Sequence, residues 1–415
     1  MLNIKRAGAV ALASAFVVPT VQAQGYISGN EFNPAISLIL DGRYADYQDE
    51  LELPGFILGP ESELPAEGFS LGHSELSLSA NVDDQFYGSA SIAIAEHDGA
   101  TEVELEEAYL ETLGLGHGAT VKFGRFLSHI GYMNSQHEHS WSFYDAPLVY
   151  TAMFGKTLYD DGVQGRWLAP TDFYLEFGAE VTRGDSFPGG ENDGHDGRAL
   201  FAKIGNDLGQ NASWQLGVSS YSTEFLERSA DSHGHGHEEE HEEEHAAELV
   251  FFDGEVDITG IDAVFKWAPT GNARNQQLIL QAEYFQRDEE ATAEFHEEDA
   301  EILSEYEGEH SGYYVQAVYR FHPTWRTGVR YGEVEPENQF EELESDGIDM
   351  EEFLEETELG STETTKRRSV MVEYTPSEFS RIRLQYNHRD WGENKDELWV
   401  LQYSMSLGSH GAHSY

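Results

Sequence analysis

Residues 173–182 read FYLEFGAEVT, and this stretch decides the fold class. Its odd-numbered positions are apolar, whereas Glu176 and Glu180 fall on the even-numbered parity. Successive side chains of a strand point to opposite faces, so this strand has one apolar face and one charged face. A membrane β-barrel turns the apolar face to lipid and the charged face to a polar lumen. The stretch therefore predicts an all-β protein, and more narrowly a transmembrane barrel.

The same period of two recurs along the chain. Residues 313–321 and 399–407 alternate apolar and polar positions in the same way. Short turns with Pro or Gly stand between many such segments, as at 169–172 and 322–324. We expect about sixteen strands in an up-and-down antiparallel barrel. They are predicted near residues 33–47, 68–82, 85–97, 102–113, 118–128, 157–169, 171–184, 197–206, 212–224, 250–268, 275–286, 311–322, 324–333, 366–375, 379–390 and 396–407.

Long loops alternate with the short turns, and the longest of them are acidic. Residues 225–249, 287–309 and 334–363 hold nine, eleven and thirteen Asp or Glu residues. Outer-membrane barrels have short periplasmic turns and long extracellular loops. We therefore expect the three acidic loops at the extracellular mouth, and Pro170 and Pro323 at the periplasmic rim.

The first residues predict export. Lys5 and Arg6 precede an apolar run over residues 7–18, and Val21-Gln22-Ala23 fits a cleavage site. We expect a signal peptide at residues 1–23 and an outer-membrane barrel at 24–415. The formal net charge of −53 excludes nucleic acid as a partner, because its phosphates would be repelled. The absence of cysteine excludes disulfides and thiolate chemistry.

One segment, residues 123–155, departs from the alternation and is rich in aromatic and histidine residues. Long structured segments between strands are uncommon and are typically functional. In a closed barrel, this segment is expected to fold inward as a constriction loop, because exposing so many large side chains is unfavourable. A surface loop is the alternative. The residues expected in the constriction are Arg125, His129, His137, His139, Trp141 and Asp145.

Strand parity predicts which charged side chains line the pore. Arginines project inward from the late strands and glutamates from the early ones. Opposed charges would create a field across the lumen, whereas pairing of each arginine with a nearby carboxylate would only brace the wall. The expected pore-lining residues are Arg320, Arg326, Arg330, Arg367, Arg381, Arg383, Glu75, Glu107, Glu111, Glu176 and Glu180.

Two histidine groups suggest metal binding. His137 and His139, with His129 and Asp145 near in sequence, are candidate ligands, and hydrogen bonds that pin the loop are the alternative. The loop at about 225–249 contains HGHGHEEEHEEEH, and imidazole beside carboxylate suits Zn²⁺, Ni²⁺ or Cu²⁺. Residues 237–241 also match the HExxH pattern of zinc proteases, but repetitive His and Glu produce this match by composition alone. We expect no required cofactor. One hypothesis is that this loop loosely binds zinc or another divalent ion, and the alternative is that the loop is merely solvated. Its expected ligands are His233, His235, His237, His241 and His245.

Several short motifs are familiar. They are Asn33–Leu38, Gly68–Gly72, Glu107–Tyr109, Gly124–Phe126 and Asp145–Val149. With them, the chain resembles bacterial outer-membrane porin-like proteins related to the phosphate-selective porins, whose His-rich members are often labelled zinc-regulated or TonB-dependent receptors. The terminal Tyr415 resembles the signal that the barrel-assembly machinery reads. The resemblance implies a homotrimer in outer-membrane lipid.

These observations favour a channel for small polar solutes or ions, with divalent metal uptake as a narrower hypothesis. A TonB-linked metal receptor and an anion- or phosphate-selective porin are the alternatives. A TonB receptor needs a plug and about 22 strands, more than this chain can supply. No nucleophile elbow or Ser-His-carboxylate pattern stands out, so an enzyme is not expected.

Overall fold

The computed structural model describes residues 34–48, 51, 53–62, 64–97, 100–230, 248–297 and 300–408. The expected signal peptide, the five histidines of 233–245 and the terminal Tyr415 lie outside the described residues. Among the described residues, no helix is long and apolar enough to cross a membrane.

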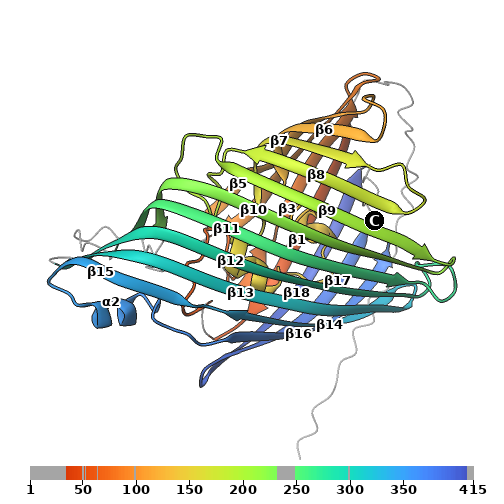
Figure 1. Cartoon of the computed structure of the whole chain (residues 1–415). Coiled ribbons are helices and arrows are strands. Elements are labelled where there is room, and N and C mark those ends of the chain that lie inside the picture. Colours follow the sequence, from red (N-terminus) through yellow and green to blue (C-terminus); the bar gives the residue numbers. More distant parts are fainter. Residues whose placement is uncertain are drawn as a thin grey trace, which may run out of the picture. The chain divides into compact units, whose positions relative to one another are not determined.

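The described chain forms one antiparallel sheet that closes on itself (Figure 1). Sixteen strands form the wall, and the last of them pairs with the first over residues 37–46 and 399–408. The prediction of a sixteen-strand up-and-down barrel is confirmed. In order around the wall, the strands are β1 (Ala35–Asp46), β3 (Ser74–Asn81), β4 (Phe86–His97), β5 (Ala100–Thr112), β6 (Ala119–Leu127), β7 (Tyr159–Leu168), β8 (Tyr174–Thr182), β9 (Gly197–Leu208), β10 (Ala212–Ala230), β11 (Glu248–Trp267), β12 (Gln277–Glu297), β13 (Ala300–His322), β14 (Trp325–Glu335), β16 (Thr365–Ser377), β17 (Ser380–Trp391) and β18 (Asn394–Gly408).

Two further strands continue wall strands beyond an interruption. β2 (Gly68–Leu71) pairs with β1 beyond its pairing with β3, and β15 (Asn338–Asp346) pairs with β13 beyond its pairing with β14. The strand expected over 68–82 is therefore present, with an interruption at Gly72 and His73 where the register against β1 shifts by one residue. A Cβ atom at Gly72 would lie 2.0 Å from Oδ2 of Asp41, so the close approach to β1 at this interruption favours glycine.

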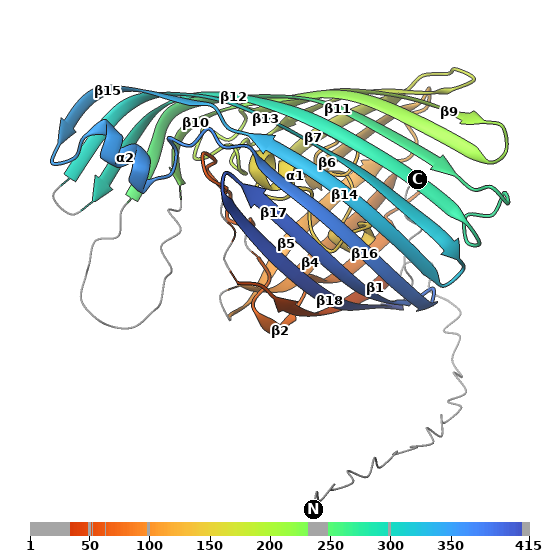
Figure 2. The same cartoon turned by 90° about the horizontal axis from the view of Figure 1, so that it is seen from below.

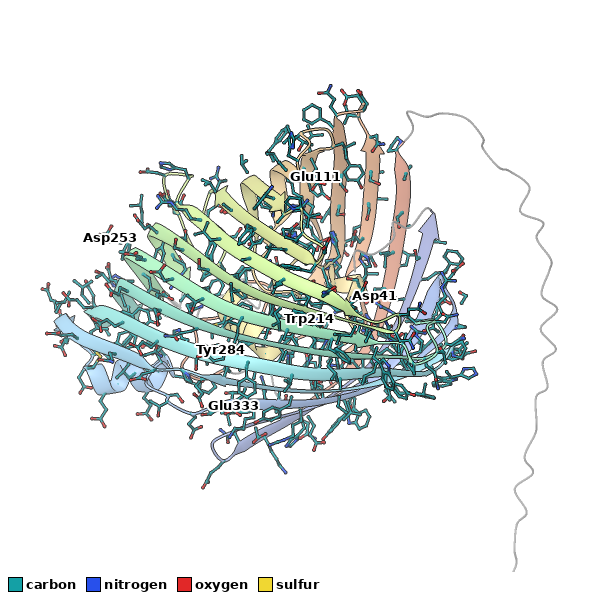
Figure 3. The ribbon with its side chains drawn as sticks, turned by 45° about the vertical axis from the view of Figure 1, so that its right-hand side comes forward. Asp41, Glu111, Trp214, Asp253, Tyr284 and Glu333 are labelled. Atoms are coloured by element: carbon teal, nitrogen blue, oxygen red, sulfur yellow. The ribbon has the colours of Figure 1, made fainter. Side chains whose placement is uncertain are left out.

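The outer face of the wall is apolar along its middle. Tyr284, Leu216 and Leu401 are among many large side chains that are 39 % exposed or more, and Tyr284 marks this surface in Figure 3. Short turns gather at one end of the barrel, which we call the periplasmic end, and long connections gather at the other. The start of β1 and the end of β18 share the periplasmic end, since Ser37 pairs with Gly408.

Four neighbouring strands extend far beyond the others (Figures 1 and 2). β10, β11, β12 and β13 have 19, 20, 21 and 23 residues, about twice what a membrane strand needs. The expected loop at 287–309 is therefore wrong, because most of it is a hairpin between β12 and β13. The expected loop at 225–249 is shortened by strand at both ends. The expected loop at 334–363 contains β15 and the helix α2 (Met350–Glu356).

The lumen differs from the polar channel expected from strand parity. A continuous apolar core lies against the inner faces of the extended strands. This core joins the inner faces of the extended strands to buried side chains from three connections between strands, residues 53–57, 130–158 and 348–359. Phe251, Ile258 and Phe285 on the wall and Phe353 in α2 are each fully buried in it. The extended strands therefore form a two-faced sheet, with acids outside and apolar side chains inside.

Candidate functional site

Residues 128–158, which we call the constriction loop, run inside the barrel (Figure 2). The loop leaves β6, forms the short helix η1 (Glu138–Ser140) and then α1 (Leu148–Phe154), and returns to β7. All seven residues of α1 are buried, and the helix packs against β12, β13 and β14. Trp141 is 3 % exposed. The expected inward fold of this segment is confirmed.

The first turn of the loop is fixed by Glu283 of β12. Its carboxylate accepts hydrogen bonds from the backbone N–H groups of Tyr132 and Met133 at 2.8 and 3.1 Å, and from Tyr150 Oη at 2.8 Å. Gly131 stands beside it with a φ of +63°, and a Cβ there would meet Oε2 of Glu283 at 2.3 Å. The tight approach to the carboxylate therefore requires glycine.

Asn134 ties the two ends of the loop together. Its Nδ2 donates to the carbonyls of Ser128 and Leu158 at 2.9 and 2.7 Å, and its Oδ1 accepts from the N–H of Leu158 at 2.7 Å. Asn134 is fully buried. The loop is therefore a closed unit with its own internal support.

Asp145 anchors the far side of the loop to three strands. Its carboxylate pairs with Arg330 of β14 and Arg367 of β16, and accepts from Gln385 and Asn387 of β17 at 2.7 and 3.0 Å. Burial alone would raise the pKa of Asp145, but the two arginines outweigh it and lower that pKa. We call this group the Asp145 clamp.

The remaining late arginines stand nearer the periplasmic end. Glu373 receives both Arg326, at 2.6 Å, and Arg383, at 2.8 Å. Arg383 also donates to the Trp141 carbonyl at 3.0 Å. Arg320 donates to the carbonyl of Pro323 at 3.0 Å. Four of the six predicted pore arginines therefore pair with carboxylates, which is the bracing arrangement.

Arg381, the sixth arginine, is half-buried. It lies on the same inward side of β17 as Arg383. Two predicted pore glutamates share one partner, because Arg166 lies 2.6 Å from Glu111 and 4.0 Å from Glu176. Glu180 binds the entrance of the constriction loop through Ser128 Oγ at 2.6 Å and the His129 N–H at 2.9 Å.

The predicted constriction residues do not all come together. Arg125 lies on the strand face shared with exposed Phe123 and pairs with Asp161 at 2.9 Å, so the structure does not place it in the constriction. His129 is half-buried beside Phe201, with ring centres 5.2 Å apart. Burial, reinforced by nearby lysine and arginine charges, lowers the pKa of His129 well below its usual value. Neither His129 nor Asp145 joins the other two histidines.

His137 and His139 stack on each other, with ring centres 5.6 Å apart, against a wall of carboxylates. Nδ1 of His139 lies 2.7 Å from Glu75 of β3, and Nε2 of His137 lies 2.9 Å from Glu107 of β5. Burial lowers the pKa of His137, but Glu106 and Glu107 outweigh it and raise that pKa well above the usual value.

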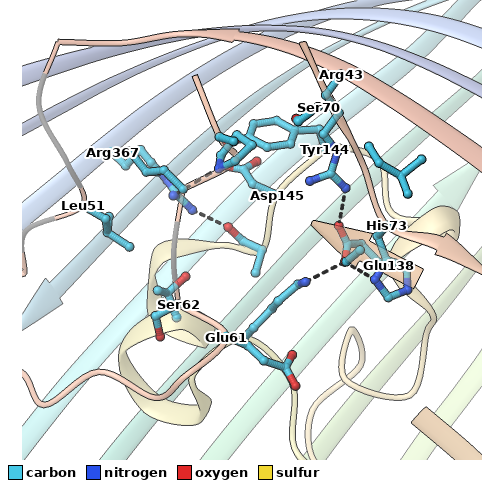
Figure 4. A pocket seen from close by; sticks show the side chains of 18 residues that line it. Arg43, Leu51, Glu61, Ser62, Ser70, His73, Glu138, Tyr144, Asp145 and Arg367 are labelled. Atoms are coloured by element: carbon cyan, nitrogen blue, oxygen red, sulfur yellow. Dashed lines mark hydrogen bonds and ion pairs between the residues drawn. The ribbon is translucent and has the colours of Figure 1, made fainter. Parts of the chain in front are cut away.

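Three neighbours of these histidines were missed in the sequence. His73 lies 3.1 Å from Glu106 and 3.3 Å from Glu138. Glu138 also binds Arg43 at 2.8 Å and Lys156 at 2.7 Å, and Figure 4 shows Arg43 and His73 converging on it. His73 stands alone in the sequence, so no spacing typical of metal ligands pointed to it. Glu106 was missed because strand parity placed it on the outer face of the barrel.

A cavity of about 90 Å³ adjoins this cluster (Figure 4). Its lining includes His73 and Glu138 on one side and Asp145 and Arg367 on the other. Residues from the connection between β1 and β2, among them Glu61, complete it. The cavity therefore lies between the histidine cluster and the Asp145 clamp.

A closed sixteen-strand barrel with an apolar outer face and an inward-folded loop is the architecture of outer-membrane porins. The chain therefore has a porin-like fold, and its barrel is that of a bacterial outer-membrane protein. No protein-family model matches the chain. It is 34% identical over 413 residues to an uncharacterized protein of Aquifex aeolicus, covering 94% of this chain and 81% of that one, and it belongs to the same family.

Solved outer-membrane proteins share the fold at low identity. OmpT of Vibrio cholerae matches with a TM-score of 0.53 and 11% identity over 92% of this chain and 99% of its own. The outer-membrane channel DcaP of Acinetobacter baumannii matches at 0.52 and 14%, over 90% and 97%. An anion-selective porin from Comamonas acidovorans matches at 0.51 and 10%, over 90% and 99%.

Proposed function

We propose that the protein is a channel through which small polar solutes or ions diffuse across the outer membrane. The observation that carries the proposal is the constriction loop, which is held inside a closed barrel by charged groups on opposite walls. Glu283 and the Asp145 clamp fix it on one side, and Glu75, Glu107 and Glu180 fix it on the other. A rigid loop at this place would set the size and charge of what passes.

The alternatives fit less well. A TonB-linked receptor encloses a separate plug in about 22 strands, whereas this wall has sixteen. A phosphate- or anion-selective pore would present unpaired arginines to the solute. Here Asp145 and Glu373 each bind two of the arginines.

Two narrower proposals rest on composition and fold likeness. The His-rich segment 233–245 would collect divalent ions such as zinc, since imidazole and carboxylate are suitable ligands. A variant lacking 233–245 should then bind fewer zinc ions, and an unchanged number would contradict this role. A homotrimer is supported by a structural neighbour solved in a trimer form, and the mass of the detergent-solubilised protein tests it.

Single-channel recording in planar lipid bilayers tests the channel itself. We expect steady ion conductance from the wild-type protein. Deleting residues 135–144 removes Trp141 and both stacked histidines, so the conductance should rise. A folded wild-type barrel without conductance would overturn the proposal, and equal conductance after the deletion would show that the loop does not limit flow.

A further inference from the structure

We propose that His73, Glu75, Glu106 and His137 bind one divalent transition-metal ion, of which Zn²⁺ fits the ligands best. The site would tie the constriction loop to the strands β3 and β5. It is separate from the His-rich segment at 233–245, and it stands on the described side chains whether or not the barrel conducts.

Three distances within this group are close to those between ligand atoms of a tetrahedral ion. Two ligand atoms about 2.0–2.1 Å from a tetrahedral Zn²⁺ are about 3.4 Å apart. Nδ1 of His137 lies 3.4 Å from Oε2 of Glu75 and 3.6 Å from Oε2 of Glu106, and Nε2 of His73 lies 3.1 Å from Oε1 of Glu106. One ligand atom from each of His73, Glu75 and Glu106 lies within 4.8 Å of the others. Two histidines and two carboxylates form a common donor set for zinc.

Three of the atoms that face the centre of this group lack well-formed hydrogen bonds, whereas Oε2 of Glu75 lies 2.7 Å from Nδ1 of His139. Nε2 of His73, Oε2 of Glu106 and Nδ1 of His137 are all buried and without one. The side chain of His73 is only 9 % exposed, and that of Glu75 is 1 % exposed. Buried polar atoms normally make well-formed hydrogen bonds, so three such atoms that have only ion-pair contacts with one another leave room for a shared cation.

A proton on His137 cannot replace that partner. Its Nδ1 faces Glu75 and Glu106 at nearly equal distances, and a single N–H can donate well to only one acceptor. A divalent ion would bind both carboxylates and would compensate both buried charges.

The outward-facing nitrogens of the two histidines are held as in known metal sites. Nε2 of His137 lies 2.9 Å from Glu107, and Nδ1 of His73 lies 3.3 Å from Glu138. A carboxylate behind a histidine ligand fixes its tautomer and aims the other nitrogen at the metal. Glu75 is steadied as well, because its Oε1 accepts from Ser77 at 2.5 Å and Ser91 at 3.1 Å.

The backbone is bent to make this grouping. The pairing of β4 and β5 matches Ser91 with Glu107 and Ile92 with Leu105, so Glu106 is an extra residue in a β-bulge. A bulge re-aims side chains, and this one lets two consecutive glutamates face the lumen. Such bulges occur preferentially beside functional sites. A cavity adjoins the site at His73.

Metal titration of the full chain in detergent, after treatment with a chelator, tests the site. Zn²⁺ is added in competition with a chromophoric chelator to the wild type and to a His73→Gln/His137→Gln variant. We expect the variant to bind one ion fewer, while a His310→Gln variant, which changes a buried histidine of β13 outside the cluster, binds as many as the wild type. A Δ233–245 variant should still bind the ion held by His73, Glu75, Glu106 and His137, which we call the tight ion.

Glu107→Gln provides a milder test, because glutamine can still accept the N–H of Leu127. It should weaken binding of the tight ion about 10–100-fold without removing it. Co²⁺ in the wild type should show the strong visible absorption of a tetrahedral site, and this band should be absent from the double variant. Equal zinc stoichiometry and affinity in the wild type and the folded double variant would overturn the site. Conductance plays no part in these readouts, so failure here leaves the channel proposal separately testable.

Discussion

At the scale of single residues, the Asp145 clamp holds the constriction loop against the late strands. Removing one partner from a buried ion pair costs about 3–5 kcal/mol, because the other charge stays buried without compensation. Asp145→Asn leaves Arg330 and Arg367 in that position. We expect the free energy of unfolding to fall by about 3 kcal/mol, as measured by denaturant titration in detergent.

The matched control is Asp185→Asn. Asp185 pairs with Arg183 at 2.7 Å, but the two side chains are 38 % and 51 % exposed, and exposed pairs contribute about 0–1 kcal/mol. The contribution of Asp145 also has a defined pH range. The pKa of Asp145 is lowered in the folded protein, so its carboxylate contributes fully to the free energy of unfolding above about pH 5. This contribution declines as the pH falls through the ordinary pKa of about 3.9 and below. The difference between wild type and Asp145→Asn should therefore be constant from pH 8 to about 5 and shrink in acid. Equal stability of the two at pH 7 would contradict the clamp.

Strand parity predicted the inward position of Glu75 and Glu107, and the unusual composition of 123–155 predicted the inward loop. Strand parity did not predict the inward position of Glu106, because the bulge shifts the parity by one residue within β5. His73 was missed because its position depends on the strand interruption at Gly72, which packs closely against Asp41 in a distant part of the chain. Arg125 was misplaced because the start of the loop was set four residues before β6 ends.

At the scale of elements, the acidic stretches show how composition can hide a strand. In β12 and β13, acids occupy the outer face while Phe295, Ile302 and Tyr306 occupy the inner face. Counting acids predicted loops, whereas the period of two predicts strands. The sheet extends because its inner face has α2 and the loops to pack against.

Phe353 of α2 carries much of that packing. It is fully buried and contacts the rings of Phe295 and Phe340, with centres 5.4 and 5.3 Å apart. Phe353→Ala should cost about 3–5 kcal/mol locally. Amide hydrogen exchange should then speed up at the tips of β12 and β13 but not in their membrane-spanning halves. Leu343→Ala, at a position 52 % exposed, should leave exchange unchanged. Global unfolding in Phe353→Ala would contradict a locally stabilised extension.

At the scale of the whole molecule, two charge distributions compete for ion preference. Lumen arginines favour anions, but Asp145 and Glu373 partly neutralise four of them. The extracellular extension carries unneutralised acids in rows across its outer face. One row pairs Asp257 with Asp288 and Glu309, and the next pairs Glu255 with Glu290 and Glu307.

Screening decides how far those rows act. The Debye length is about 30 Å at 0.01 M salt and about 3 Å at 1 M, so the rows reach the channel mouth only in dilute salt. We therefore expect a reversal potential that shows cation preference near 0.01 M and little preference near 1 M. Asp288→Asn/Glu290→Gln removes the middle of both rows and should weaken the preference at low salt while leaving the conductance at 1 M unchanged. Anion preference at 0.01 M would mean that the lumen arginines dominate, because their field is confined inside the barrel and is screened less by salt.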